Sequence, residues 1–302
     1  MLNQDVLNEF IFDARMRKLS ERTIKGYKNN NLRFFKFIEN EYQITELEDI
    51  CPQAIKGYIT YLTSMGRKET YINGIIKTVR AYFAYTMNEG YLIKNPMDKV
   101  KFQKEPIPLI TTFNDEEVLR MIKHFNGARF LDVRNKLMMT LLFDTGLRNN
   151  ELCNLKVTDI RDTYIFVDGK GKKQRVVPIS PVLNKQIIKY NRVRTHYIKD
   201  KFAYQTEFYL LSQKGRKLTI EAIERIVKDC GEACGVRKGI RISPHTCRHY
   251  FAQAQLKNGC DLYTLSRLMG HNNPNITKIY LRSMKDDDFL DLAVGTSPLM
   301  NL

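Results

Sequence analysis

The chain has 302 residues, of which 43% are hydrophobic, and it carries a formal net charge of +16 at pH 7. This length favours two domains with sizeable cores, and the positive charge favours a polyanionic partner, nucleic acid before a membrane surface. No apolar run approaches the roughly 20 residues of a membrane-spanning helix, and the polar start MLNQDVLNEF is unlike a signal peptide. We therefore expect a cytoplasmic protein that binds nucleic acid and does not associate with membranes.

Residues 1–100 have the apolar periodicity of four helices. The first carries an apolar stripe that begins at Val6, and Ser20 is a suitable N-cap for the second. Pro52 suits the start of the third helix, and the fourth begins near Lys68. The aromatic residues fall on the apolar faces, so we assign them to the core rather than to base stacking.

Three basic side chains of this region lie off the apolar stripe, namely Lys68, Lys77 and Arg80. They are candidate contacts to DNA phosphates. Each of them would equally suit an ordinary solvated charge.

Residues 101–112 contain two prolines and lack helical periodicity, which predicts an extended linker. We therefore divide the chain into an N-terminal domain at 1–100 and a second domain at 113–302. A linker between two basic domains suggests a clamp that closes around a duplex.

The second domain is predicted to be mainly helical with one small β-sheet. Asn114 is a suitable N-cap before three carboxylates in a first helical turn, and a mostly apolar helix at 131–143 is expected at the domain centre. Two alternating segments, 164–167 and 175–179, predict a hairpin with a Gly-Lys-rich turn. Further helices are expected at 183–197 and 220–234, and a short strand at 208–212.

Residues 243–280 concentrate phosphate chemistry within a few short helices. Ser243 is a good N-cap and Pro244 a natural first helical residue, so a helix begins there. His245 and Arg248 then share one face near a helix N-terminus, which attracts anions. An imidazole and a guanidinium in this position suit a phosphate, so we interpret the segment as an active site.

Two more polar side chains follow on this segment. Asp261 caps a short helix that Gly270 ends, and this ending presents His271. A third helix, entered through Asn273, carries Tyr280.

The order His-x-x-Arg, Gly-His and a tyrosine nine residues beyond that histidine resembles the catalytic segment of the tyrosine recombinase (phage integrase) family. Upstream, DTGLRNNEL resembles the family's TGLRxxEL box, which implies a first catalytic arginine at Arg148 with Glu151 as its structural neighbour. The segment DGKGKKQRVVP resembles the family's GKGxKxRxVP hairpin. This likeness implies a catalytic lysine, the general acid for the 5′ oxygen, at Lys170.

The resemblance implies a mainly α, two-domain DNA clamp, in which a four-helix core-binding domain accompanies an α+β catalytic domain. It also implies site-specific recombination through a 3′-phosphotyrosyl intermediate and a Holliday junction. The implied catalytic residues are Arg148, Lys170, His245, Arg248, His271 and Tyr280, with Glu151 and His249 in support. On the hairpin, Lys172, Lys173 and Arg175 are candidate DNA contacts, although composition alone would equally suit a soluble hairpin tip.

The same residues satisfy the chemical needs of phosphodiester cleavage, which are a nucleophile, positive charge beside the nonbridging oxygens and a proton for the departing oxygen. Tyr280 offers a phenolic oxygen, and Arg148 and Arg248 offer planar forks that fit phosphate. His245 suits a base or a hydrogen-bonding partner, and His271 suits a hydrogen-bond donor.

The sequence offers no metal or cofactor site. The aspartates at 286–288 lie beyond the active-site segment, and no phosphate-binding loop pattern occurs. Cys230 and Cys234 are one helical turn apart but lack the partners of a metal site, and the six cysteines have no regular spacing. We therefore expect reduced thiols and metal-free transesterification without a cofactor.

The resemblance implies double-stranded DNA with paired inverted-repeat sites as the partner, and a homotetramer on synapsed DNA that assembles from monomers. We expect the tail at 284–302 to dock on a neighbouring subunit; the alternative is that it folds back onto its own domain. Xer recombinases and mobile-element integrases both match the two-domain chain. Two other functions remain, a DNA-binding accessory protein that does not cleave and type IB topoisomerase-like strand passage.

Overall fold

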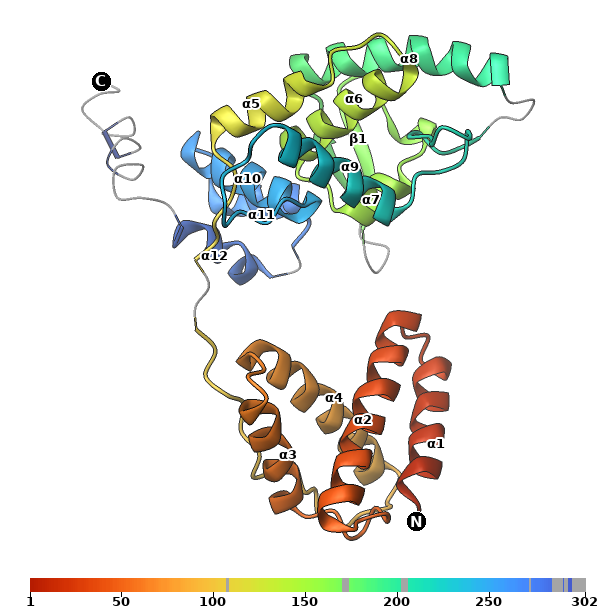
Figure 1. Cartoon of the computed structure of the whole chain (residues 1–302), viewed down its shortest axis with the longest axis vertical. Helices are drawn as coiled ribbons and strands as arrows, with labels where there is room; N and C mark the ends of the chain where they lie inside the picture. Colours follow the sequence, from red (N-terminus) through yellow and green to blue (C-terminus); the bar gives the residue numbers. More distant parts are fainter. Residues whose placement is uncertain are drawn as a thin grey trace. The chain divides into compact units, whose positions relative to one another are not determined.

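The computed structural model describes residues 1–106, 109–169, 174–201, 206–271, 273–283, 290 and 293–294. The chain forms two compact units that divide between residues 107 and 108, within the stretch predicted as a linker (Figure 1). A membrane-spanning helix is absent from the described part of the chain, because none of its helices combines sufficient length with sufficient apolar character.

The first unit contains the four predicted helices. They are α1 (Asn3–Met16), α2 (Glu21–Tyr42), α3 (Pro52–Ser64) and α4 (Glu69–Asn88). The Ser20 hydroxyl accepts a hydrogen bond from the Thr23 amide and so caps α2, while Pro52 is the first residue of α3. The capping chemistry therefore sets these helix starts, as the sequence predicts.

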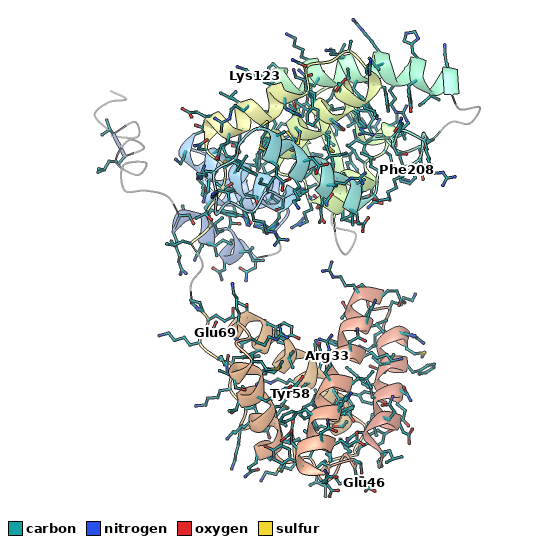
Figure 2. The ribbon with its side chains drawn as sticks, in the orientation of Figure 1. Arg33, Glu46, Tyr58, Glu69, Lys123 and Phe208 are labelled. Carbon is teal, nitrogen blue, oxygen red and sulfur yellow. The ribbon has the colours of Figure 1, made fainter. Side chains whose placement is uncertain are left out.

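Aromatic side chains fill the core of the first unit. Phe34 and Phe83 are fully buried, and Tyr58 is 4% exposed. Figure 2 shows Tyr58 among the helices, and its ring centre lies 5.4 Å from that of Phe34. These rings therefore pack the helices together and are not available for base stacking.

The second unit is built around α6 (Phe130–Thr145), in which every residue from Leu137 to Phe143 is buried. This helix contacts α5, α8 and α10 (Figure 1). The central apolar helix predicted at 131–143 is confirmed. The remaining helices are α5 (Asp115–His124), α7 (Asn149–Asn154), α8 (Pro181–Lys201), α9 (Ile220–Ala233), α10 (Pro244–Lys257), α11 (Leu262–Met269) and α12 (Lys278–Leu281), and one-turn 3-10 helices lie at Val157–Asp159 and Pro274–Ile276.

A two-stranded antiparallel sheet lies beside the helices. Its strands are β1 (Tyr164–Asp168) and β2 (Gln174–Pro178), with Tyr164 opposite Pro178 and Asp168 opposite Gln174. The predicted hairpin is therefore present. Its turn, with the candidate residues Lys170, Lys172 and Lys173, lies outside the described residues.

The strand expected at 208–212 is wrong. The backbone there makes two isolated bridges, Lys156 with Phe208 and Leu211 with Lys217. Side chains of α8 bind two carbonyls of this stretch, because the Tyr190 hydroxyl and the Arg194 guanidinium donate to the Tyr209 oxygen and Arg194 also donates to the Phe208 oxygen. Carbonyls satisfied by side chains in this way do not contribute to a continuous strand ladder.

The helix expected to begin at Asn273 is divided into two short pieces. Asn273 caps the 3-10 helix at Pro274–Ile276, and α12 follows after Thr277. Tyr280 therefore lies on a helix of four residues.

We predict that Leu142→Ala strongly destabilises the second unit. Leu142 is fully buried in the last turn of α6, and truncation of such a leucine costs about 2–5 kcal/mol of unfolding free energy. Leu119, whose side chain on α5 is 53% exposed, provides the control Leu119→Ala. Urea unfolding of the three proteins measures the difference, and equal losses for the two variants would contradict the central position of α6.

Candidate active site

Helix ends bring the predicted residues of the second unit together. Arg148 immediately precedes α7, where its backbone amide donates to the Glu151 carboxylate over 2.8 Å. Gly270 ends α11 in the left-handed conformation, with φ of 62°, and its oxygen accepts a hydrogen bond from Arg148 Nη2 at 3.0 Å. His271 follows directly in the chain. The termini of α6, α7, α10 and α11 thus form the site.

The end of α6 requires a glycine. Gly146 has a φ of 59°, and a Cβ atom there would lie 2.4 Å from the Phe251 ring of α10. Any other side chain would therefore collide with α10 as well as strain the backbone. The close approach also exposes the Gly146 carbonyl to α10, where it accepts a hydrogen bond from Arg248.

Arg248 is the buried cation of the site, with 3% of the residue exposed. Its guanidinium donates to the carbonyls of Gly146 and Met269 and contacts His271 Nε2 at 3.2 Å. Burial, helped by the positive charge of Arg148, lowers the pKa of Arg248 to about 9. The side chain therefore remains charged at pH 7 and is fixed in orientation before any ligand binds.

Glu151 forms ion pairs with two arginines at once. Its side chain is 5% exposed, and it accepts hydrogen bonds from Arg148 Nη1 at 2.8 Å and from both terminal nitrogens of Arg175 at 2.9 and 2.8 Å. Burial alone would raise the Glu151 pKa, but the bonds from Arg175 and Arg148 outweigh it and lower that pKa to about 2. Glu151 is therefore ionised throughout the neutral range.

Arg175 has a different role from the DNA contact suggested by the sequence. Its side chain is 10% exposed. Both terminal nitrogens bind Glu151, and Nε donates to the Leu268 carbonyl at 2.7 Å. Arg175 therefore ties β2 to α11 inside the protein in this structure.

The hydrogen-bond partners of His271 indicate which ring nitrogen carries the proton. Nε2 lies against an arginine nitrogen, which can only donate, so Nε2 accepts. Nδ1 then carries the proton and donates to the Thr277 hydroxyl at 2.8 Å. Burial and the neighbouring Arg248 lower the pKa of His271 to about 4, so the ring is neutral at pH 7.

Tyr280 is buried, with 2% of the residue exposed. It packs in an apolar cluster with Phe251 of α10 and with Leu265 and Met269 of α11. Its hydroxyl lies 3.1 Å from Nδ1 of His249. Burial raises the pKa of Tyr280, and the nearby arginines oppose that rise.

His249 thus lies closer to the chemistry than the supporting position that the sequence suggested. Its ring touches Tyr280 on one side, and on the other it meets the His245 ring edge-on, with the ring centres 4.2 Å apart. The four-residue spacing in α10 accounts for the contact between the two histidines. The contact with Tyr280 depends on where α12 packs, and the sequence pattern contains no signal for that.

The segment after Tyr280 is tied to the segment through which the chain enters the second unit. The Ile110 amide donates to the Ser283 hydroxyl at 3.1 Å, and the Ile110 carbonyl accepts from the Gln253 amide of α10 at 2.9 Å. Ile110 also packs against the apolar cluster that holds Tyr280. These contacts hold α12 against α10.

The candidate DNA residues of the first unit differ in their surroundings. Lys68 and Lys77 are exposed. Arg80 donates to the Val100 carbonyl at 2.7 Å, and its guanidinium lies 4.4 Å from the centre of the Phe102 ring. Arg80 therefore already has protein partners, whereas Lys68 retains the exposure that a phosphate contact needs.

The described residues contain no group of three or more His, Cys, Asp or Glu side chains placed to hold a metal ion. All six cysteines lie in this part of the chain and are free.

Comparisons with known proteins match nearly the whole chain. Residues 111–286 match the phage integrase family, and residues 9–90 match the N-terminal SAM-like domain of phage integrases. The tyrosine recombinase XerC of Thermodesulfovibrio yellowstonii is 31% identical over 284 residues, which cover 92% of this chain and 91% of that protein. The tyrosine recombinase XerD of Listeria monocytogenes is 29% identical over 285 residues, or 93% of this chain and 95% of the relative.

Solved structures share the fold. XerH site-specific recombinase bound to palindromic difH substrate superposes with a TM-score of 0.74 at 20% identity, covering 94% of this chain and 82% of that one. A lambda integrase tetramer bound to a Holliday junction gives a TM-score of 0.71 at 18% identity, covering 95% and 78%.

We predict that Glu151→Gln changes how stability depends on pH. The pKa of Glu151 lies at about 2, below its usual 4.5, so the ionised carboxylate stabilises the fold fully above pH 4.5 and this contribution disappears as the pH falls towards 2. Between about pH 5 and pH 3 the wild type should lose more unfolding free energy than the variant, towards a full difference of roughly 3 kcal/mol. Urea unfolding across this range, with the exposed Glu224→Gln as control, measures it; parallel curves for wild type and Glu151→Gln would refute the buried ion pair.

Proposed function

Because this chain belongs to the phage integrase family, we propose that it cleaves and rejoins DNA strands as a tyrosine-type site-specific recombinase. One observation carries the proposal. Arg248 contacts His271, Arg148 donates to the carbonyl of Gly270, the residue before His271, and Tyr280 contacts His249, the residue after Arg248, so the residues at the family's motif positions gather in one region. A DNA-binding protein that had lost cleavage would not need to keep this set.

In the first step the Tyr280 oxygen attacks the scissile phosphorus and gives its phenolic proton to a base, a role for which the sequence suggests His245. A tyrosine–phosphorus bond forms, the bond to the 5′ oxygen breaks, and the protein carries a 3′-phosphotyrosyl link. The departing 5′ oxygen takes a proton, and the family resemblance gives that role to Lys170. A 5′ hydroxyl of the partner strand then attacks the phosphotyrosine and restores a phosphodiester. The covalent link conserves the bond energy, so rejoining needs no nucleotide.

Arg148 and Arg248 supply positive charge where negative charge develops on the nonbridging oxygens. Backbone carbonyls at the ends of α6 and α11 hold both guanidiniums before DNA arrives. Little reorganisation is then required as the transition state forms. A guanidinium also presents several donors in one plane, which fits a phosphate better than an ammonium does.

The partner in this proposal is double-stranded DNA with paired inverted-repeat sites. The net charge of +16 supports such a partner, and the XerH and lambda integrase structures were solved with DNA. We extend to this chain the tetramer on a Holliday junction seen for lambda integrase. A DNA substrate also agrees with the cytoplasmic location expected from the sequence.

The tail at 284–302 supplies the contact between protomers in this assembly. Only residues 290, 293 and 294 of it are described, and Leu290 and Val294 expose 63% and 62% of their surfaces. Two apolar side chains one helical turn apart suit docking on a neighbouring subunit. If each protomer passes its tail to the next, the contact is head-to-tail. Such contacts form a closed ring only when every protomer donates one tail and binds another.

We predict that Tyr280→Phe binds DNA normally but forms no covalent adduct, since the variant lacks only the attacking oxygen. A nicked suicide substrate traps the adduct of the wild type, and a denaturing gel detects it. Tyr164→Phe, which alters a tyrosine that is 39% exposed on β1, should form the adduct at the wild-type level. A persistent adduct in Tyr280→Phe would show that another residue is the nucleophile.

We predict that deletion of residues 289–302 leaves binding to a single half-site unchanged, because α10 to α12 and the first unit remain. Cooperative binding to a full site should weaken, and strand exchange should be lost. Gel-shift titrations and a two-plasmid recombination assay measure the two effects. Recombination at the wild-type rate would exclude the role of the tail between subunits and would favour a tail that folds back on its own domain.

A further inference from the structure

Thr277 is a fully buried residue between the 3-10 helix at Pro274–Ile276 and α12. Its hydroxyl lies 2.8 Å from Nδ1 of His271, and among the described residues this hydroxyl makes no other hydrogen bond. A hydroxyl enclosed by protein without a partner costs free energy. The contact with His271 therefore determines which way the hydroxyl turns, and the family boxes, which identified the histidine, do not include its partner.

The pair has two possible arrangements, because a hydroxyl and a neutral imidazole nitrogen can each donate or accept. In the free protein Arg248 Nη2, which can only donate, lies 3.2 Å from His271 Nε2, so Nδ1 carries the proton and Thr277 accepts. In the second arrangement Thr277 donates to Nδ1, and the ring carries its proton on Nε2. The second arrangement satisfies the buried hydroxyl hydrogen, but it turns two donors, Nε2 and Arg248, towards each other.

A phosphate bound at Arg248 removes this conflict, because its oxygens accept from the guanidinium and from Nε2 together. The sequence suggests His271 as a hydrogen-bond donor to the phosphate, and donation from the nitrogen beside Arg248 needs a proton on Nε2. Resting on the proposed recombinase function, we infer that Thr277 is a positioning residue, whose hydroxyl donates to Nδ1 when DNA binds and so holds His271 in the tautomer that donates to the scissile phosphate.

The change conserves the charge of the ring. His271 gives up the proton on Nδ1 and takes one on Nε2 by exchange with water, while the Thr277 hydroxyl rotates about its C–O bond. Burial and the neighbouring Arg248 lower the pKa of His271 to about 4, so the ring is neutral at pH 7. An imidazolium would donate from both nitrogens whatever its neighbours, whereas in a neutral ring the partner of Nδ1 selects the tautomer.

Thr277 also meets the helix that carries Tyr280. Its backbone carbonyl accepts a hydrogen bond from the Tyr280 amide at 3.1 Å, and its amide donates to the Pro274 carbonyl at 2.9 Å. The side chain of Thr277 thus contacts the histidine proposed to bind the phosphate, and its backbone begins α12. One residue therefore fixes His271 and the start of α12 relative to each other.

The direct test observes the tautomer. Protein with ¹⁵N-labelled histidine and the Tyr280→Phe substitution, which leaves DNA uncleaved, is studied by NMR alone and bound to a half-site duplex, and loss of signals in His271→Ala assigns the ring. We expect the proton on Nδ1 in the free protein and on Nε2 in the complex. A ring that keeps its proton on Nδ1 in the complex, or carries protons on both nitrogens there, would overturn the inference.

Two substitutions separate the hydroxyl from the space that the side chain fills. Thr277→Val removes the hydroxyl at similar size, and Thr277→Ser keeps it. We expect Thr277→Val to bind a half-site as the wild type does but to cleave at least about 10-fold more slowly in a single turnover, since loss of a whole oxyanion donor costs about 100- to 1,000-fold. Thr277→Ser should cleave at close to the wild-type rate. Thermal unfolding identifies which variants are folded.

The matched control is Thr86→Val, which removes the hydroxyl of another fully buried threonine, on α4 of the first unit. It should cleave at the wild-type rate. Cleavage at that rate by Thr277→Val as well, or equally slow cleavage by Thr277→Ser and Thr277→Val, would contradict the role of the hydroxyl.

A double-mutant cycle shows whether Thr277 acts through His271. In that case Thr277→Val adds little to the loss already caused by His271→Ala. Two losses that multiply would show that Thr277 acts by packing alone and would overturn the inference. Failure of the proposed function would look different, because the wild type would then form no adduct with a suicide substrate, whereas the NMR test needs only a DNA complex.

Discussion

The second unit depends on one buried carboxylate that holds two arginines. Glu151 joins the start of α7, through Arg148, to strand β2, through Arg175, and Arg175 continues to the end of α11. Three elements distant in sequence therefore share one charge network. Such a network is costly to break, because removal of one partner leaves a charge without compensation in a poorly solvated place. The negative charge of Glu151 also offsets part of the repulsion by which Arg148 lowers the pKa of Arg248.

Helix ends supply the other acceptors of the site. The last carbonyls of a helix have no partner within it and carry the negative end of its dipole. Gly146 and Gly270 end α6 and α11 in the left-handed conformation, and their carbonyls, with that of Met269, accept from Arg148 and Arg248. The glycines therefore end the helices and also orient the cations. Mobile arginines would have to lose side-chain entropy when DNA binds, whereas these have already lost it in folding.

Much of this arrangement could be predicted from the sequence because it is encoded locally. Ser20, Asn114, Ser243 and Asp261 cap the helices at which they were expected, and the spacing of the family boxes identified the residues that converge. The errors concern long-range contacts. Residues 208–212 have strand-like alternation, but side chains of α8 bind the carbonyls of Phe208 and Tyr209. Arg175 resembles a DNA contact until its buried partner, 24 positions away, is known. His249 of α10 contacts Tyr280 of α12, 31 residues later in the chain, and no local sequence pattern predicts this contact.

Tyr280, the proposed nucleophile, lies on a helix too short to hold its own position. Four residues give almost no helix stability in isolation, since forming the first turn is unfavourable. Neighbours must therefore place α12, and three contacts do so: Thr277 with His271, Tyr280 with His249 and Ser283 with Ile110. The first two involve histidines beside Arg248, and the third involves the segment that enters the unit. The position of the Tyr280 oxygen therefore depends on these partners, so the proposed binding of DNA at the arginines bears on the same four residues. In the proposed reaction, the nucleophile lies on α12, which is stable only through its contacts with neighbouring residues of the site. Cleavage would therefore depend on DNA being correctly bound at that site.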